Sequence, residues 1–277
     1  MSRTDVVKST THFESGISNL GDAYALNPLY RFGMMDPTHH YYTYFDDFFT
    51  FQDSVLTTEA SDTAADEWKV TIIDTDTDNA ASQAIVDEAG GVLRITNNNN
   101  TLDSTVMQKR GESFLIDPNR PFAFKARIQP HVASGTNWWM GLSAYDTTPL
   151  DSLDCIMFQK PSGSTINFSI SKGGVESGSS AIADASANWQ TMAFVYTPPT
   201  FYGPHADTIR VWFTTGTDNG DLSIDYLVPV KTYTGASSLA GLTDTEMTIT
   251  FGVLNAAIQA QTMQVDYISA SFNASRA

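Results

Sequence analysis

The pattern of hydrophobic and polar positions changes near residue 45. From residue 46 onward, short segments alternate between apolar and polar side chains, which is the period of a β-strand with one buried face. The clearest is PFAFKARIQ, residues 121–129, where apolar side chains take every second position and Lys125 and Arg127 lie between them. The part of the chain after residue 45 is therefore predicted to be built from strands.

Similar segments recur along the chain, separated by stretches rich in Gly, Pro, Ser and Asn that are typical of turns. Only residues 63–68 and 79–90 have the composition of short helical turns, and turns are predicted at 172–180 and 233–241, among others. Many short strands with such turns favour an all-β fold, a two-sheet antiparallel jelly-roll sandwich. The predicted strands are 44–51, 91–96, 105–110, 121–129, 137–145, 154–160, 165–171, 189–196, 208–215, 222–230, 247–255 and 262–272.

Residues 1–45 follow neither the helical nor the strand period. They mix Gly, Asn, Asp and Pro with isolated large apolar residues, which disordered tails generally lack. We therefore expect an extended N-terminal arm, residues 1–45, that orders against a partner, followed by a sandwich domain, residues 46–277. A lid folded over its own domain is the alternative. The arm residues expected to contact the partner are Leu26, Leu29, Tyr30, Phe32, Met34, Tyr41, Tyr42 and Tyr44.

The junction between arm and body is the aromatic segment PTHHYYTYFDDFFTF, residues 37–51. His39 and His40 could bind a metal together with Asp46 and Asp47. Adjacent residues of an extended chain point to opposite sides, so neighbouring histidines seldom hold one ion without a sharp turn. We interpret the segment as side-chain packing where the first strand begins.

Composition and charge limit the kinds of molecule that the protein is expected to bind. The chain has 277 residues, 42% of them hydrophobic, enough to bury a full core. Residues 1–45 carry three basic and four acidic side chains, whereas residues 46–277 carry 12 basic and 27 acidic ones, within a total net charge of −16. An acidic body disfavours nucleic-acid binding. No apolar stretch has the length of a membrane helix, and the single cysteine, Cys155, excludes an intrachain disulfide.

The order of the predicted strands resembles a known family. From Asp46 to about Phe272 it is similar to the concanavalin A-like lectin/glucanase sandwich, in the form common in structural proteins of tailed bacteriophages. The segments that carry the resemblance are YFDDFFTF, GVLRITNNN, FAFKARIQ, NWWMGLSAYD, DCIMFQK, WQTMAFVY, TIRVWFTTG, MTITFGVLN and TMQVDYISASF. It implies that the first and last strands lie side by side. It also implies a virion protein, on the outer capsid surface, made in the host cytoplasm.

Glycoside hydrolysis requires two carboxylates that flank the scissile bond. The glucanase branch of the family carries them as Glu-x-Asp-x-(x)-Glu on one strand, and this sequence has no such segment. Glu112 and Asp117 have a spacing that places them on opposite faces of a strand. Asp221 and Asp225 share a face, where solvated outer-face acids are the simpler interpretation. We therefore expect no enzymatic activity.

The segment DTDTDN is the strongest candidate for a metal site. Asp74, Asp76 and Asp78 imitate the first ligands of an EF-hand calcium loop. Asn79 and Ile85 stand where that loop requires Gly and the bidentate Glu, so the EF-hand interpretation fails. A looser calcium site stays open, and no other cofactor is expected.

Trp138 and Trp139 are neighbours on one predicted strand and so face opposite sides of a sheet. One is expected to fill the core while the other reaches a surface. There it could stack on a sugar beside Asn137, or anchor a subunit interface, where tryptophan is enriched. Interior packing of both rings is the third interpretation and the one that the sequence favours most.

These observations favour a non-enzymatic structural protein of a bacteriophage virion, a capsid decoration or cement subunit. Its arm would bind the major capsid protein or another virion protein, and its sandwich would face outward, most simply as a homotrimer. The alternative is a carbohydrate-binding adhesin, or a tail or head appendage module, that recognises host-surface glycans. A glycan hydrolase or lyase with an unusual site is the third class.

Overall fold

The structure is a computed structural model, and it describes residues 41–48, 51, 54–56, 67–73, 81–86, 91–111, 114–117, 119–133, 135–145, 154–161, 163–199, 207–216, 228–234 and 245–273. The arm residues Leu26, Leu29, Tyr30, Phe32 and Met34 lie outside these ranges, as do Asp74, Asp76 and Asp78. Within the described ranges the chain forms strands and no helix, so these ranges contain no helix that could cross a membrane.

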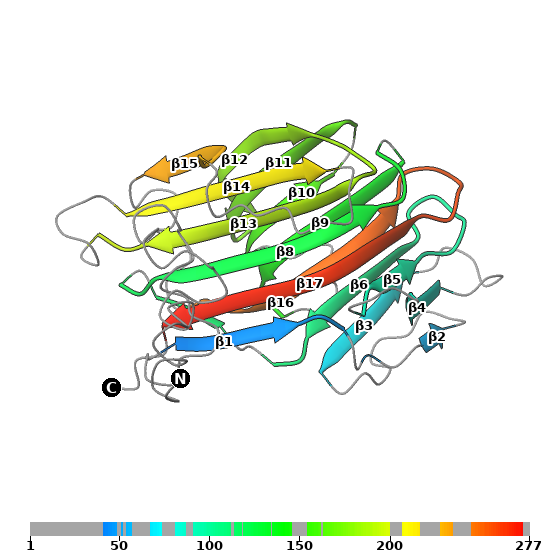
Figure 1. Ribbon diagram of the computed structural model, residues 1–277, viewed down its shortest axis with the longest axis horizontal. Coiled ribbons are helices and arrows are strands. Elements are labelled where there is room, and N and C mark those ends of the chain that lie inside the picture. The colour runs from blue at the N-terminus through cyan, green and yellow to red at the C-terminus, as the bar shows by residue number, and fades with distance from the viewer. Residues whose placement is uncertain are drawn as a thin grey trace, which may run out of the picture.

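The strands form two antiparallel sheets packed face to face, as the alternating pattern predicts (Figure 1). The nine-stranded sheet, called the back sheet here although it faces the viewer in Figure 1, has the order β15-β14-β13-β8-β17-β5-β4-β2, with β1 also paired to β17. Their bounds are β15 Lys231–Thr234, β14 Thr208–Gly216, β13 Trp189–Thr197, β8 Phe122–Pro130, β17 Thr262–Asn273, β5 Leu93–Thr96, β4 Ala81–Ile85, β2 Ser54–Leu56 and β1 Tyr41–Asp46.

The front sheet has eight strands, in the order β12-β11-β10-β9-β16-β6-β3, with β7 also paired to β16. Their bounds are β12 Val175–Asp184, β11 Thr165–Lys172, β10 Cys155–Lys160, β9 Thr136–Ser143, β16 Thr245–Asn255, β6 Ser104–Lys109, β3 Trp68–Ile73 and β7 Phe114–Ile116. The two-sheet antiparallel sandwich expected from the sequence is confirmed.

One hydrophobic core fills the space between the sheets. Every second residue of a strand points inward, so Phe122, Phe124 and Ile128 of β8 are buried there as predicted. Rings from the two sheets meet in this layer: Phe114 of the front sheet stacks on Phe272 of the back sheet, with centroids 4.3 Å apart. The burial of this layer is the main source of stability of the sandwich.

The first and last strands of the described chain lie side by side, as the resemblance implied. Strand β1 pairs with the second half of β17, from Tyr41 opposite Asn273 to Asp46 opposite Ile268 (Figure 1). The sheet therefore begins four residues before the expected end of the arm. Tyr41, Tyr42 and Tyr44, which were expected to be arm residues, are therefore part of a sheet strand, and the contact of Tyr41 and Tyr42 with a partner stays a prediction.

The aromatic junction is a packed corner of the sandwich. Asp46 accepts three hydrogen bonds: from the Tyr44 hydroxyl at 2.9 Å, from Trp68 Nε1 at 2.9 Å and from the Phe48 backbone N–H at 2.7 Å. Phe48 has a φ of 56°, in the left-handed region, and its ring is buried against Trp68 and Phe251. Burial, followed by the charge of Asp46, raises the pKa of the Tyr44 hydroxyl far above its ordinary value. Tyr44 and Asp46 thus make their hydrogen bonds within the sandwich domain, as the packing interpretation predicted.

Three local predictions were wrong. Residues 172–180 were expected to be a turn, but strand β12 runs through most of them as the edge of the front sheet. Residues 79–90 were expected to contain a helical turn, but β4 pairs there with β5 and β2. Strand β15 occupies the start of a third predicted turn, 233–241. Gly, Ser and Ala give little strand signal of their own, and pairing with a neighbouring strand decided these conformations.

Candidate functional site: the outward face of the front sheet

The front face is defined here as the outward-pointing side chains of β6, β16, β9, β10 and β11. Pairing places these side chains in rows across the sheet. Gly252 lies opposite Trp139, Trp139 opposite Gln159, and Gln159 opposite Asn167. The inward-pointing neighbours of these residues, such as Trp138 and Phe158, belong to the core. Sequence analysis missed Gln159 and Asn167, although the alternation of CIMFQK and TINFSIS could have assigned them to the outer face.

Trp138 and Trp139 face opposite sides of the sheet, as expected. Trp138 is fully buried in the core, and Trp139 belongs to a small outer cluster with Val106, Cys155 and Met157. Only 9% of Trp139 is exposed, which is too little for a ring that stacks broadly on a sugar. Both rings are therefore packed, which is the interpretation that the sequence favoured most; the alternative, in which one ring reaches a surface, is not what the structure shows.

Trp139 lies against the sheet because its neighbour on β16 lacks a side chain. A Cβ atom added to Gly252 would lie 2.7 Å from Trp139 Cζ2 and 2.8 Å from the backbone oxygen of Thr105. Both distances are below any normal contact, so only glycine leaves room for the indole. Gly252 therefore sets the height of the Trp139 ring above the sheet.

We predict that Gly252→Ala lowers the free energy of unfolding by about 1–3 kcal/mol, because the methyl group forces the Trp139 ring or the β6 backbone to move. Urea unfolding followed by tryptophan fluorescence measures this change. In a Trp139→Ala background the same substitution should be less costly, because the ring is no longer there to clash. An equal cost in both backgrounds would show that Trp139 does not depend on Gly252.

Two hydrogen-bonded groups of polar side chains flank Trp139. On one side, Gln108 Nε2 donates to Thr250 Oγ1 at 3.1 Å, and Thr250 Oγ1 lies 2.7 Å from Ser143 Oγ; all three residues are fully buried. On the other side, Gln159 Nε2 donates to Ser169 Oγ at 2.6 Å. Gln159 and Asn167 are only half-buried. The accessible polar part of the front face therefore lies over β10 and β11.

Asn137 was expected to be a polar neighbour of a sugar-binding tryptophan. It is mostly buried, and its side-chain oxygen accepts a hydrogen bond from Lys160 Nζ at 3.3 Å. Burial lowers the pKa of the Lys160 ammonium group. Asn137 thus provides a hydrogen-bond acceptor for a buried lysine, a role that its place in the sequence did not indicate.

Acidic residues are widely spaced on the strands of the front sheet. They are Glu246 of β16, near the end of that strand, and Glu176 and Asp184 of the edge strand β12. Strands β9, β10 and β11 separate β16 from β12, so Glu246 lies about 19 Å from the β12 acids at roughly 4.8 Å per strand. Glu176 and Asp184 are about 26 Å apart along β12, at roughly 3.3 Å per residue. Glycosidases need two carboxyl groups about 5–9.5 Å apart. The described strands of this sheet therefore bring no such pair together.

Candidates for other chemistry are equally sparse in the part of the chain that the structure describes. No group of three or more His, Cys, Asp or Glu side chains there could hold a metal ion. Cys155, the single cysteine, is a buried thiol in the outer cluster with Trp139. The candidate hydrolase acids Asp221 and Asp225, and Glu112, lie outside the described residues, as do His39 and His40.

Comparison with known proteins supports the fold. No family model matches the sequence, and no curated protein matches it. Among solved structures, a protein of unknown function from Shewanella oneidensis MR-1 is 14% identical, with a TM-score of 0.52 over 100% of this chain and 97% of that one. An endo-1,3-β-glucanase from Streptomyces sioyaensis is 14% identical, with a TM-score of 0.53 over 86% of this chain and 98% of that one. The lectin UEA-II, complexed with galactose, is 11% identical, with a TM-score of 0.49 over 80% and 98%.

The first two likenesses, with TM-scores above 0.5, identify the class of fold. The chain is an all-β jelly-roll sandwich of the lectin/glucanase type, a fold compatible with carbohydrate binding. At 14% identity the likeness shows the fold alone, so neither activity nor ligand follows from it. The bacteriophage part of the resemblance stays a prediction.

Proposed function

We propose that this chain is a non-catalytic structural protein of a bacteriophage particle, a decoration subunit that binds capsid protein through residues 1–40 and presents its sandwich outward. The observation that carries the non-catalytic part is the front face, whose centre has hydroxyl, amide and apolar side chains and no acidic pair. The attachment role rests on the apolar side chains that the N-terminal segment carries, Leu26, Leu29, Tyr30, Phe32 and Met34. Tyr44 leaves this set because its hydroxyl bonds within the sandwich.

Several copies are proposed to act together on one shell, as trimers around its local symmetry axes. Linked copies convert individually weak contacts into tight attachment, because binding of one copy raises the effective concentration of the next. The high negative charge of residues 46–277 then keeps the decorated surface from adsorbing nucleic acid.

The test uses phage particles that lack this protein. The full chain and a chain that begins at Tyr41 are each incubated with the particles, and bound protein is measured by sedimentation. We expect the full chain to cosediment and the shortened chain to stay in solution, while circular dichroism shows that both are folded. Cosedimentation of the shortened chain, or of neither chain, would contradict the attachment role.

A second candidate is recognition of neutral glycans, favoured by the accessible amides of Gln159 and Asn167 next to Trp139. Amide side chains both donate and accept hydrogen bonds, which suits sugar hydroxyls. The name of the glucanase suggests β-1,3-glucan oligosaccharides as probes for calorimetry. If the front face binds them, Gln159→Ala and Asn167→Ala should each weaken binding roughly ten-fold. Release of new reducing ends would contradict the non-catalytic proposal.

A further inference from the structure

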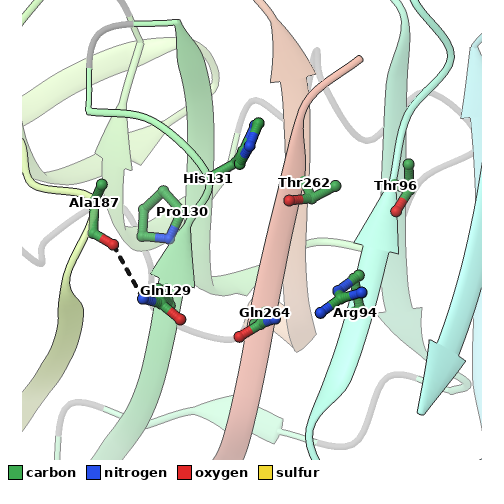
Figure 2. Close-up of a pocket in the computed structure, with 8 residues that line it drawn as sticks. All are labelled: Arg94, Thr96, Gln129, Pro130, His131, Ala187, Thr262 and Gln264. Atoms are coloured by element: carbon green, nitrogen blue, oxygen red, sulfur yellow. Dashed lines mark hydrogen bonds between the residues drawn. The ribbon is translucent and has the colours of Figure 1, made fainter. Parts of the chain in front are cut away.

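The outward side of the back sheet carries a polar groove, far from the front face. It has a volume of about 440 Å³ and is lined by Arg94, Thr96, Gln129, Pro130, His131, Ala187, Thr262 and Gln264. Figure 2 shows that the lining side chains come from three neighbouring strands, β8, β17 and β5, with His131 directly after β8 and Ala187 at the side. The groove has the size of small-molecule sites, which begin at about 300 Å³.

Strand pairing arranges the groove as two rows of three polar side chains. In the first row, Gln264 of β17 lies opposite Gln129 of β8 on one side and opposite Arg94 of β5 on the other. In the second row, Thr262 lies opposite Thr96 (Figure 2), and the His131 backbone N–H donates to the Thr262 backbone oxygen at 2.8 Å. Neighbouring strands are about 4.8 Å apart, so each row presents its polar groups at regular intervals across the groove.

Arg94 is the permanent positive charge of this groove. Its side chain is exposed and makes no ion pair or hydrogen bond with another described residue. No lining residue is acidic. The nearest acid along β17, Asp266, is bonded to Arg127 of β8. Within the described part of the chain Arg94 thus has no partner, and such a cation in a protein of net charge −16 favours an anion at this place.

The uncharged side chains of the groove indicate which kind of anion it would bind. Phosphate-binding sites gather several cations or backbone N–H groups, whereas here one guanidinium stands among two amides, two hydroxyls and an imidazole. Of the amides, Gln129 is positioned by its bond from Nε2 to the Ala187 oxygen at 3.2 Å, shown dashed in Figure 2. Arginine binds a carboxylate through two parallel hydrogen bonds, and the uncharged groups suit hydroxyls.

We propose that this groove binds a carboxylate-bearing saccharide, such as a uronic acid unit of an acidic polysaccharide. Arg94 holds the carboxylate, and the Gln129, Gln264 and Thr262 side chains hold ring hydroxyls. A volume of about 440 Å³ accommodates a ligand of about two sugar rings. The site is independent of the proposed capsid attachment and of the front face, which lies on the opposite side of the sandwich.

The experiment titrates the full chain with trigalacturonic acid by calorimetry at low salt, and with its methyl ester, which has the same rings without the charges. We expect binding of the acid only, and an at least ten-fold loss for Arg94→Gln, in line with the strength of charge-assisted hydrogen bonds. Arg210→Gln removes the same charge from an exposed position of β14 on the same sheet, outside the groove, and should leave the affinity unchanged.

Three results would overturn the proposal: no binding of the acid, equal binding of the ester, or an equal loss in the Arg94 and Arg210 variants. The third would indicate general attraction between charges in place of a site. Gln159→Ala on the front face should not affect this binding, so failure of the front-face glycan candidate and failure of this site can be told apart. Circular dichroism of each variant separates lost binding from lost folding.

Discussion

A chain that begins after residue 48 is expected not to fold cooperatively, or to lose more than about 5 kcal/mol of unfolding free energy. The deletion removes β1, which pairs with six residues of β17, and it removes Phe48 from the core. Loss of a buried phenylalanine ring alone costs about 3–5 kcal/mol. The deletion also leaves the second half of β17, a central strand of the back sheet, without the partner that β1 provides. Urea unfolding followed by circular dichroism measures the loss.

The matched control begins at Tyr41 and keeps the whole of β1. We expect its unfolding free energy to lie within about 1 kcal/mol of that of the full chain, since the pairing of β1 with β17 is intact. Equal stability of the two shortened chains would show that β1 contributes nothing to the sandwich. Loss of folding already in the control would show that residues 1–40 belong to the domain, and the attachment role would lose its basis.

Asp46→Asn is expected to lower the unfolding free energy by about 2–4 kcal/mol. The carboxylate accepts bonds from the Trp68 indole, the Tyr44 hydroxyl and the Phe48 backbone N–H. Hydrogen bonds to charged groups contribute about 1.5–3 kcal/mol each, and an amide has a single oxygen to share among these donors. The substitution also weakens the bond that holds the Phe48 backbone in the left-handed region, a conformation that is unfavourable for a residue other than glycine and needs this support. Thermal or urea unfolding tests this prediction.

Asp47→Asn is the control for the change in charge. Asp47 is the next residue and is exposed, so its replacement should change stability by no more than about 0.5 kcal/mol. If the two variants are equally stable, the Asp46 network is not what holds this corner. If Asp46→Asn weakens stability while Tyr44→Phe does not, the indole and backbone bonds carry the effect.

The local pattern predicted the fold well where side chains alternate strongly. The strands around Phe124, Phe168 and Phe251 could be placed from sequence because each has a row of large apolar residues at every second position. Strand β12, VESGSSAIAD, could not, because its small polar residues have no preference of their own and are held by pairing with β11. The same holds for the roles of Asp46 and Gly252, which depend on neighbours distant in the sequence.

The sequence by itself determined the all-β class and the core-facing positions, because strand period and burial are encoded locally. The adjacency of the first and last strands was implied by the family resemblance and did not follow from periodicity. Only the tertiary structure decided which polar residues meet. Strands β8, β17 and β5 are far apart along the chain, yet pairing places Gln129, Gln264 and Arg94 in one row. Pairing also packs Trp139 over Gly252 instead of exposing it. Contacts between distant strands depend on register, which local periodicity does not specify.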